Sequence, residues 1–308
     1  MRRGSVMTLR IQASRLIEGD AATVHWLLRL GVAMCFVGHG AFGIITKGAW
    51  LPYFELIGIS EPWPWRLMPI IGTMDIIVGF LALAHPCRAL FAWAAAWTIW
   101  TALLRPLAGE GWSEFFERAG NYGVPLTLLV LAGLRAPWFA TLCNPRSEFD
   151  EHSRYRVAWM LRLTTASLLA GHAGCGVILC KASLAQHYAI MWPNAAAGLV
   201  PWVGGFELLI ALVVLARPAP ALLMGVVGWK LATEMLFFGS GAPAPIFEVI
   251  ERGGSYVAPL ALALVMMQNS RDPPKPVGNV APQAESWTQC LDFEAALAPL
   301  ARVSGSGC

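Results

Sequence analysis

Charged residues are scarce in this chain of 308 residues. Asp, Glu, Lys and Arg make up only 13% of it, whereas a soluble globular domain carries about 25%. Hydrophobic residues make up 56%, and the mean hydropathy is +0.56. A soluble fold has too little polar surface to cover so much apolar side chain. The composition therefore predicts an integral membrane protein, with the lipid bilayer as its solvent and partner.

The sequence also lacks the patterns of several functional classes. Its basic residues are scattered among apolar runs, which excludes a nucleic-acid partner of the usual basic-stripe kind. No C-x-x-C pair and no zinc-like spacing occurs among the cysteines, so no metal site is predicted and the thiols are expected to be buried. The seven cysteines are Cys35, Cys87, Cys143, Cys175, Cys180, Cys290 and Cys308.

Apolar runs of the length that crosses a membrane recur along the chain. They predict an all-α polytopic fold with about eight transmembrane helices, separated by segments that combine proline with charge. The predicted spans are 25–45, 67–85, 88–105, 120–140, 158–180, 198–216, 219–238 and 255–270.

The distribution of Lys and Arg between loops predicts the orientation. With a cytoplasmic N-terminus, the inside segments hold Arg2, Arg3, Arg10, Arg15, Arg88, Arg135, Arg146, Arg154, Arg156, Arg217, Arg271, Lys275 and Arg302. The outside loops hold Lys47, Arg66, Arg105, Arg118, Lys181 and Arg252. This bias predicts that both termini are cytoplasmic, in a plasma membrane or, in a Gram-negative bacterium, the inner membrane. The first helix is expected to be retained, because no A-x-A cleavage site follows the basic residues that precede it.

Three blocks of sequence recur at an offset of 132 to 134 residues. "LRLGVAMCFVGHGAFGIITK" at 28–47 aligns with "LRLTTASLLAGHAGCGVILCK" at 161–181. "PIIGTMDIIVGFLALAHP" at 69–86 aligns with "PWVGGFELLIALVVLARP" at 201–218, and "ERAGNYGVPLTLLVLA" at 117–132 with "ERGGSYVAPLALALV" at 251–265. The repeat predicts two tandem, parallel four-helix units.

These blocks set the predicted division of the chain. A cytoplasmic N-terminal segment (1–24) precedes the first unit (25–142), and a cytoplasmic linker (143–156) joins it to the second unit (157–270). The tail (271–308) is rich in proline and is predicted to be mostly flexible, with a short helix near 290–302.

The order of motifs within each unit resembles the DoxX-like family of four-helix membrane proteins. These motifs are a Gly/His cluster with a following lysine, an acidic second helix that ends at a proline, and a polar cluster that opens the fourth helix. The resemblance implies a membrane subunit or accessory of a quinone-linked or thiol/sulfur redox system, with protein partners in a membrane redox complex. The family usually has one unit, so the tandem form is a departure from its pattern.

Ionisable residues inside the predicted spans are the first candidate site, because each is costly to insert into lipid. Asp75 aligns with Glu207 and His39 with His172, whereas Lys230 and Glu234 belong to the second unit alone and are expected to pair across one helical turn. Each carboxyl either forms a structural hydrogen bond within its unit or has a functional role, in which it carries protons or contacts a quinone. Two facing histidines could ligate haem, but an interhelical hydrogen bond is the favoured role of each.

A second candidate site is the polar cluster at the outer mouths of the predicted fourth and eighth helices. It consists of Glu117, Arg118, Asn121 and Tyr122, repeated as Glu251, Arg252, Ser255 and Tyr256. The acidic residue of such a cluster stabilises the N-terminus of its helix electrostatically, or the cluster binds a lipid head group or a solute. Trp97 and Trp229 occupy equivalent places and are expected to fill space between helices.

Three functions remain open from the sequence. The first is the redox subunit that the family resemblance implies, for which no motif identifies a cofactor. The second is a carrier or permease for a small solute, which the paired intramembrane carboxyls favour. The third is a non-catalytic membrane scaffold or assembly factor.

Overall fold

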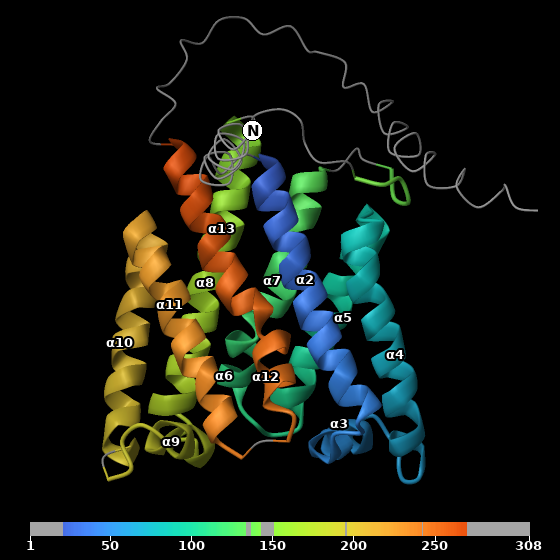
Figure 1. Ribbon diagram of the computed structural model, residues 1–308, viewed down its shortest axis with the longest axis vertical. Coiled ribbons are helices and arrows are strands. Elements are labelled where there is room, and N and C mark those ends of the chain that lie inside the picture. Colours follow the sequence, from blue (N-terminus) through green and yellow to red (C-terminus); the bar gives the residue numbers. More distant parts are fainter. Residues whose placement is uncertain (1–20, 134–136, 143–150, 195, 242, 270–308) are drawn as a thin grey trace, which may run out of the picture. The chain divides into compact units, whose positions relative to one another are not determined.

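The apolar runs form helices in the computed structural model, which describes residues 21–133, 137–142, 151–194, 196–241 and 243–269 (Figure 1). The predicted first unit, called the first unit below, covers α2 (Ala21–Ile44), η1 (Gly48–Trp50), α3 (Leu51–Leu56), α4 (Trp63–Ala84), α5 (Arg88–Leu107), α6 (Trp112–Glu117) and α7 (Ala119–Ala132). The predicted second unit, called the second unit below, covers α8 (Glu151–Val177), α9 (Ala182–Ala189), α10 (Ala196–Ala216), α11 (Pro220–Met235), η2 (Leu236–Gly239), α12 (Pro245–Glu251) and α13 (Gly253–Asn269). Within the described ranges the fold is all-helical, apart from an isolated bridge between Cys87 and Thr141.

Five segments of the described chain are long and apolar enough to cross a membrane. They are α2, α4, α10 from Gly198, α11 together with η2, and α12 together with α13 up to Gln268. A sixth is added if α8 and α9, which meet at an angle of 95°, form one span. The chain therefore has five or six candidate spans by length and composition, where the sequence pattern predicted eight.

The two remaining predicted spans differ from the others for identifiable reasons. The helix α5 covers the predicted 88–105 segment, but tryptophans and threonines in its centre reduce its hydropathy. The helix α7 is only 14 residues long, shorter than the ~20 residues that cross a bilayer. It ends at Gly133, which has φ of 72°, a left-handed conformation that glycine adopts without strain.

Helices from the two predicted units pack against each other within one compact body. The helix α2 contacts α4 of its own unit and also α12 and α13, while α8 contacts α10 and also α6 and α7. The helices α7 and α13 contact each other, and Figure 1 shows α4 and α10 at opposite edges of the bundle. The largest apolar core accordingly combines residues of both units, including Leu28, Leu128, Leu161 and Leu262.

Glycines permit the closest approaches between the units. A Cβ atom on Gly38 of α2 would overlap the backbone of Glu251, and one on Gly171 of α8 would overlap the backbone of Glu117. Glycine is required at both positions, because no side chain fits between backbones at this separation. Each first helix is thereby packed directly against a charged segment of the other unit.

Several predicted segments lie partly or wholly outside the described residues. The helix α8 begins at Glu151, so the end of the predicted 143–156 linker is helical, while 143–150 is not described. The N-terminal residues 1–20 and the tail from 270 onward, with its predicted helix at 290–302, are also outside.

Candidate functional site

The structure pairs each candidate histidine with the acidic residue of the next long helix. His39 Nδ1 lies 2.8 Å from Asp75 Oδ2, and His172 Nδ1 lies 2.5 Å from Glu207 Oε2. Both carboxyl side chains are fully buried. Each carboxyl therefore has the polar partner that an ionisable group inside a membrane requires.

Small residues bring the histidine and the carboxyl of the first pair together. Glycines at 40 and 43 of α2 lie against the backbone of α4 at Gly72, where there is no room for a Cβ. This close helix packing places His39 one hydrogen bond from Asp75. His39 also stacks on Trp50, with ring centroids 4.5 Å apart, so its ring is held on a second side.

A cavity of about 110 Å³ lies beside the first pair and is called the aromatic cavity here. It is lined mainly by aromatic and apolar side chains, as ligand pockets usually are. Its walls are Cys35, Phe36 and His39 of α2; Trp50, Tyr53, Phe54 and Ile57; Ile71 of α4; Trp97, Thr98, Trp100, Thr101, Leu104 and Arg105 of α5; and Arg118, Asn121 and Glu251.

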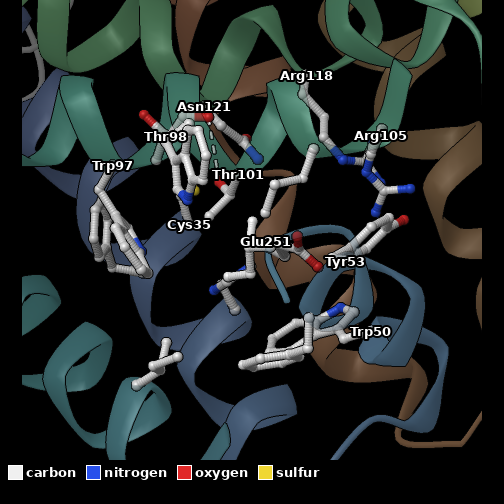
Figure 2. A pocket seen from close by; sticks show the side chains of 17 residues that line it. Cys35, Trp50, Tyr53, Trp97, Thr98, Thr101, Arg105, Arg118, Asn121 and Glu251 are labelled. Carbon is white, nitrogen blue, oxygen red and sulfur yellow. Dashed lines mark hydrogen bonds between the residues drawn. The ribbon is translucent and has the colours of Figure 1, made fainter. Parts of the chain in front are cut away.

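Charged groups gather on one side of the aromatic cavity. Figure 2 shows Arg105, Arg118 and Tyr53 on the side opposite Trp97, with the carboxylate of Glu251 between them. The Tyr53 hydroxyl donates to Glu110, and burial raises the pKa of Tyr53 to about 12, so this donor is retained at neutral pH. The cavity thus has an aromatic side and a side that holds both charge signs.

The two predicted outer-mouth clusters contact each other in the structure. Arg252 Nε is 3.7 Å from Glu117 Oε1, which joins the two clusters directly. Lysines reinforce the junction reciprocally: Lys47 of the first unit pairs with Glu248 at 2.6 Å, and Lys181 of the second unit pairs with Glu114. Buried charges are tolerated where each has partners of opposite sign.

The uncharged residues of the two clusters lie outside the charged junction and have different surroundings. Asn121 lines the aromatic cavity, whereas its counterpart Ser255 is buried. The hydroxyls of Tyr122 and Tyr256 donate to backbone carbonyls seven residues earlier, at Phe115 and Val249. These two tyrosines therefore fix the short helices α6 and α12 against α7 and α13.

The predicted Lys230–Glu234 pair is confirmed, with Nζ and Oε1 3.2 Å apart. Both side chains are almost completely buried. Arg252 Nε adds a second contact, 3.1 Å from Glu234 Oε2. The pair is therefore part of the charged junction between the units. Among the described residues, no group of three or more His, Cys, Asp or Glu side chains is placed to hold a metal ion.

Four of the candidate site residues line the aromatic cavity, namely His39, Arg118, Asn121 and Glu251, but sequence analysis did not identify the aromatic residues of its walls as part of a site. Trp97 was expected to fill space, yet it lines the cavity, and its counterpart Trp229 donates from Nε1 to Glu207 Oε1 at 2.7 Å. The His–carboxyl pairs could have been predicted from the repeat, because a histidine and a carboxyl recur at nearly the same separation in both units. The separation is 36 residues between His39 and Asp75 and 35 residues between His172 and Glu207.

The sequence was compared with protein-family models, curated proteins and solved structures. None of them matches this chain. Arguments about function therefore rest on the sequence motifs and on the geometry of the site.

Proposed function

We propose that this chain is a membrane subunit or accessory of a quinone-linked or thiol/sulfur redox system, and that the aromatic cavity binds the quinone. The observation that carries the proposal is an aromatic pocket beside a His–carboxyl pair whose carboxyl is fully buried. A quinone has a flat apolar ring with polar oxygens at its edge, which suits apolar walls with a few polar groups. The motif order that resembles the DoxX-like family supports the same role and its protein partners in a membrane redox complex.

The size and position of the cavity suit a single lipid-soluble ring. Its volume of about 110 Å³ is near that of the ~150 Å³ apolar cavity known to accept benzene. Trp100 lines the cavity and is 42% exposed on the apolar surface of α5. A ligand tail can therefore leave past Trp100 towards lipid while the ring remains inside.

The proposed architecture is two tandem four-helix units with eight spans, resembling the DoxX-like family in duplicate. In this arrangement, α2, α4, α5 and α6 with α7 cross the membrane in the first unit. The equivalent spans of the second unit are α8, α10, α11 and α12 with α13. The matching contacts of α2 with α12 and α13, and of α8 with α6 and α7, support this correspondence.

Filling the aromatic cavity tests the binding function. In Thr101→Trp, an indole replaces a small side chain on the cavity wall, so affinity for decylubiquinone and for decylubiquinol is expected to fall by about tenfold or more. Binding is measured by titration of protein in lipid nanodiscs. The control Ile77→Trp adds the same bulk at a position of α4 that is 52% exposed, and should bind as the wild type does. Failure of the wild type to bind either compound would refute the proposed function.

The proposed topology places both termini in the cytoplasm of a plasma membrane, in agreement with the loop charge bias. In intact cells, an impermeant thiol reagent is expected to label a cysteine placed at Ser60 and to spare one placed at Ser147. The host chain has its native cysteines replaced by alanine, because Cys180 is exposed. Labelling of Ser147→Cys alone would show the opposite orientation.

A further inference from the structure

Glu251 is a residue of the second unit that lines the aromatic cavity beside the first. It is only 8% exposed, and Figure 2 shows its carboxylate directed into the cavity. Within the described part of the chain, no hydrogen bond or ion pair joins this carboxylate to another residue. Its oxygens are not sealed off by protein atoms, in contrast to Asp75 Oδ1. A buried polar group without a partner is costly, which favours a ligand that supplies one.

The repeat places Glu117 of the first unit at the position equivalent to Glu251, and Glu117 has two cationic partners. Its Oε2 accepts from Nη1 of Arg118, and its Oε1 lies 3.7 Å from Nε of Arg252. Arg118 and Arg252 are themselves equivalent in the repeat. Both arginines therefore pair with the carboxylate of Glu117, and the carboxylate of Glu251 is left facing the cavity.

A difference in sequence between the units explains why Arg252 does not pair with Glu251. Glu234 of the second unit stands where the first unit has Ala102, and its Oε2 lies 3.1 Å from Arg252 Nε. Arg252 Nη1 also contacts Glu248 at 2.7 Å. The extra carboxylate of Glu234 thus engages the guanidinium, because opposite charges attract strongly where little water screens them.

The backbone of Glu251 is fixed at the cavity by close packing. Gly38 of α2 leaves no room for a Cβ against the backbone of Glu251, so the end of α12 lies directly on α2. Gly38 immediately precedes His39, which lines the same cavity and contacts Asp75. The carboxylate of Glu251 therefore stands in the cavity wall beside the His39–Asp75 pair.

We propose that Glu251 is the ligand-binding carboxylate of the aromatic cavity and that it accepts a hydrogen bond from a hydroxyl group on the ring of the ligand. This inference rests on the proposed function, because it needs a ring-bearing ligand in the cavity. Arg105 and Arg118 line the same side and can donate to the oxygen of that hydroxyl. A hydroquinone both donates and accepts, whereas the carbonyl oxygen of a quinone only accepts. The cavity therefore favours the reduced form of a quinone pair.

The preference is tested with decylubiquinol and decylubiquinone, titrated separately into the wild-type protein in nanodiscs under anaerobic conditions. We expect the quinol to bind about tenfold more tightly, since the quinone leaves the Glu251 carboxylate without a donor. Equal affinity for the two compounds, or tighter binding of the quinone, would overturn the inference. It would leave the proposed function standing, because that function requires only that the cavity binds.

Glu251→Gln tests the assigned residue. The amide keeps the size of the side chain but is uncharged and also donates, so it serves a quinone as well as a quinol. The preference for the quinol is expected to fall from about tenfold to about twofold or less. Glu55→Gln is the matched control, because Glu55 is exposed on α3 and does not line the cavity, and it should keep the tenfold preference. An unchanged preference in Glu251→Gln would overturn the assignment.

The thermal midpoint without ligand gives an independent readout of the open carboxylate. Glu251→Gln is expected not to lower the midpoint, because no partner inside the protein is lost. Glu117→Gln is expected to lower it, because Glu117 is paired with Arg118 and Arg252. If Glu251→Gln lowers the midpoint as much as Glu117→Gln does, the carboxylate of Glu251 is engaged within the protein and the inference is wrong.

Discussion

Gly171→Ala is expected to destabilise the folded protein by about 3 kcal/mol or more, because the added methyl group meets the backbone of α6 at Glu117. Backbone atoms cannot rotate away as a flexible side chain can, so α8 and α6 must separate. The change is measured as the midpoint of thermal loss of monodisperse protein in detergent. Gly38→Ala, which meets the backbone of α12 at Glu251, is expected to have an effect of the same sign.

The matched control is Gly225→Ala in α11. No atom lies within contact distance of a Cβ built on Gly225, which is on the exposed side of its helix. Alanine favours helix by about 1 kcal/mol over glycine, so this variant should match or slightly exceed the wild type. Equal midpoints for Gly171→Ala and Gly225→Ala would contradict the close packing between the units.

Arg252→Met is expected to destabilise the protein by about 3 kcal/mol, because it removes a buried cation that three carboxylates share and leaves each of them with one basic partner fewer. The guanidinium contacts Glu248 at 2.7 Å, Glu234 at 3.1 Å and Glu117 at 3.7 Å. Methionine preserves much of the side-chain volume, so the loss is mainly electrostatic. The measurement is again the thermal midpoint in detergent.

Two further variants separate charge from packing. Arg66→Met removes an exposed arginine of α4 and is expected to change stability by no more than about 0.5 kcal/mol. Glu234 contacts both Arg252 and Lys230, so Glu234→Gln and Arg252→Met together are expected to destabilise the protein by less than the sum of their separate effects. Strictly additive effects would show that the electrostatic explanation is wrong.

The helical class of the fold could be predicted from the sequence because the apolar runs and the Pro-containing breaks are local signals. The Lys230–Glu234 pair was predicted for the same reason, since residues four apart share a helix face. The number of candidate spans was harder to predict from the sequence. Trp97, Thr98, Trp100 and Thr101 make α5 less apolar, and these residues line the aromatic cavity.

The contacts between distant segments could not be predicted from local pattern. Charge and spacing do not specify that Lys47 pairs with Glu248 or that Arg252 reaches Glu117, because these contacts depend on how the helices of the two units are arranged. The aromatic cavity combines residues of α2, α3 and α5 with Glu251 of α12. Its charged side therefore exists only in the assembled fold.

The packing of α2 against α12 and α13 has a consequence for biosynthesis. Translation produces α2 some two hundred residues before its partner helices α12 and α13. Gly38 consequently faces no partner backbone until Glu251 has left the ribosome. The nascent first unit must wait in the membrane with one side of α2 uncovered, so a ribosome that stalls before α12 releases a chain that quality-control proteases can recognise by that uncovered side.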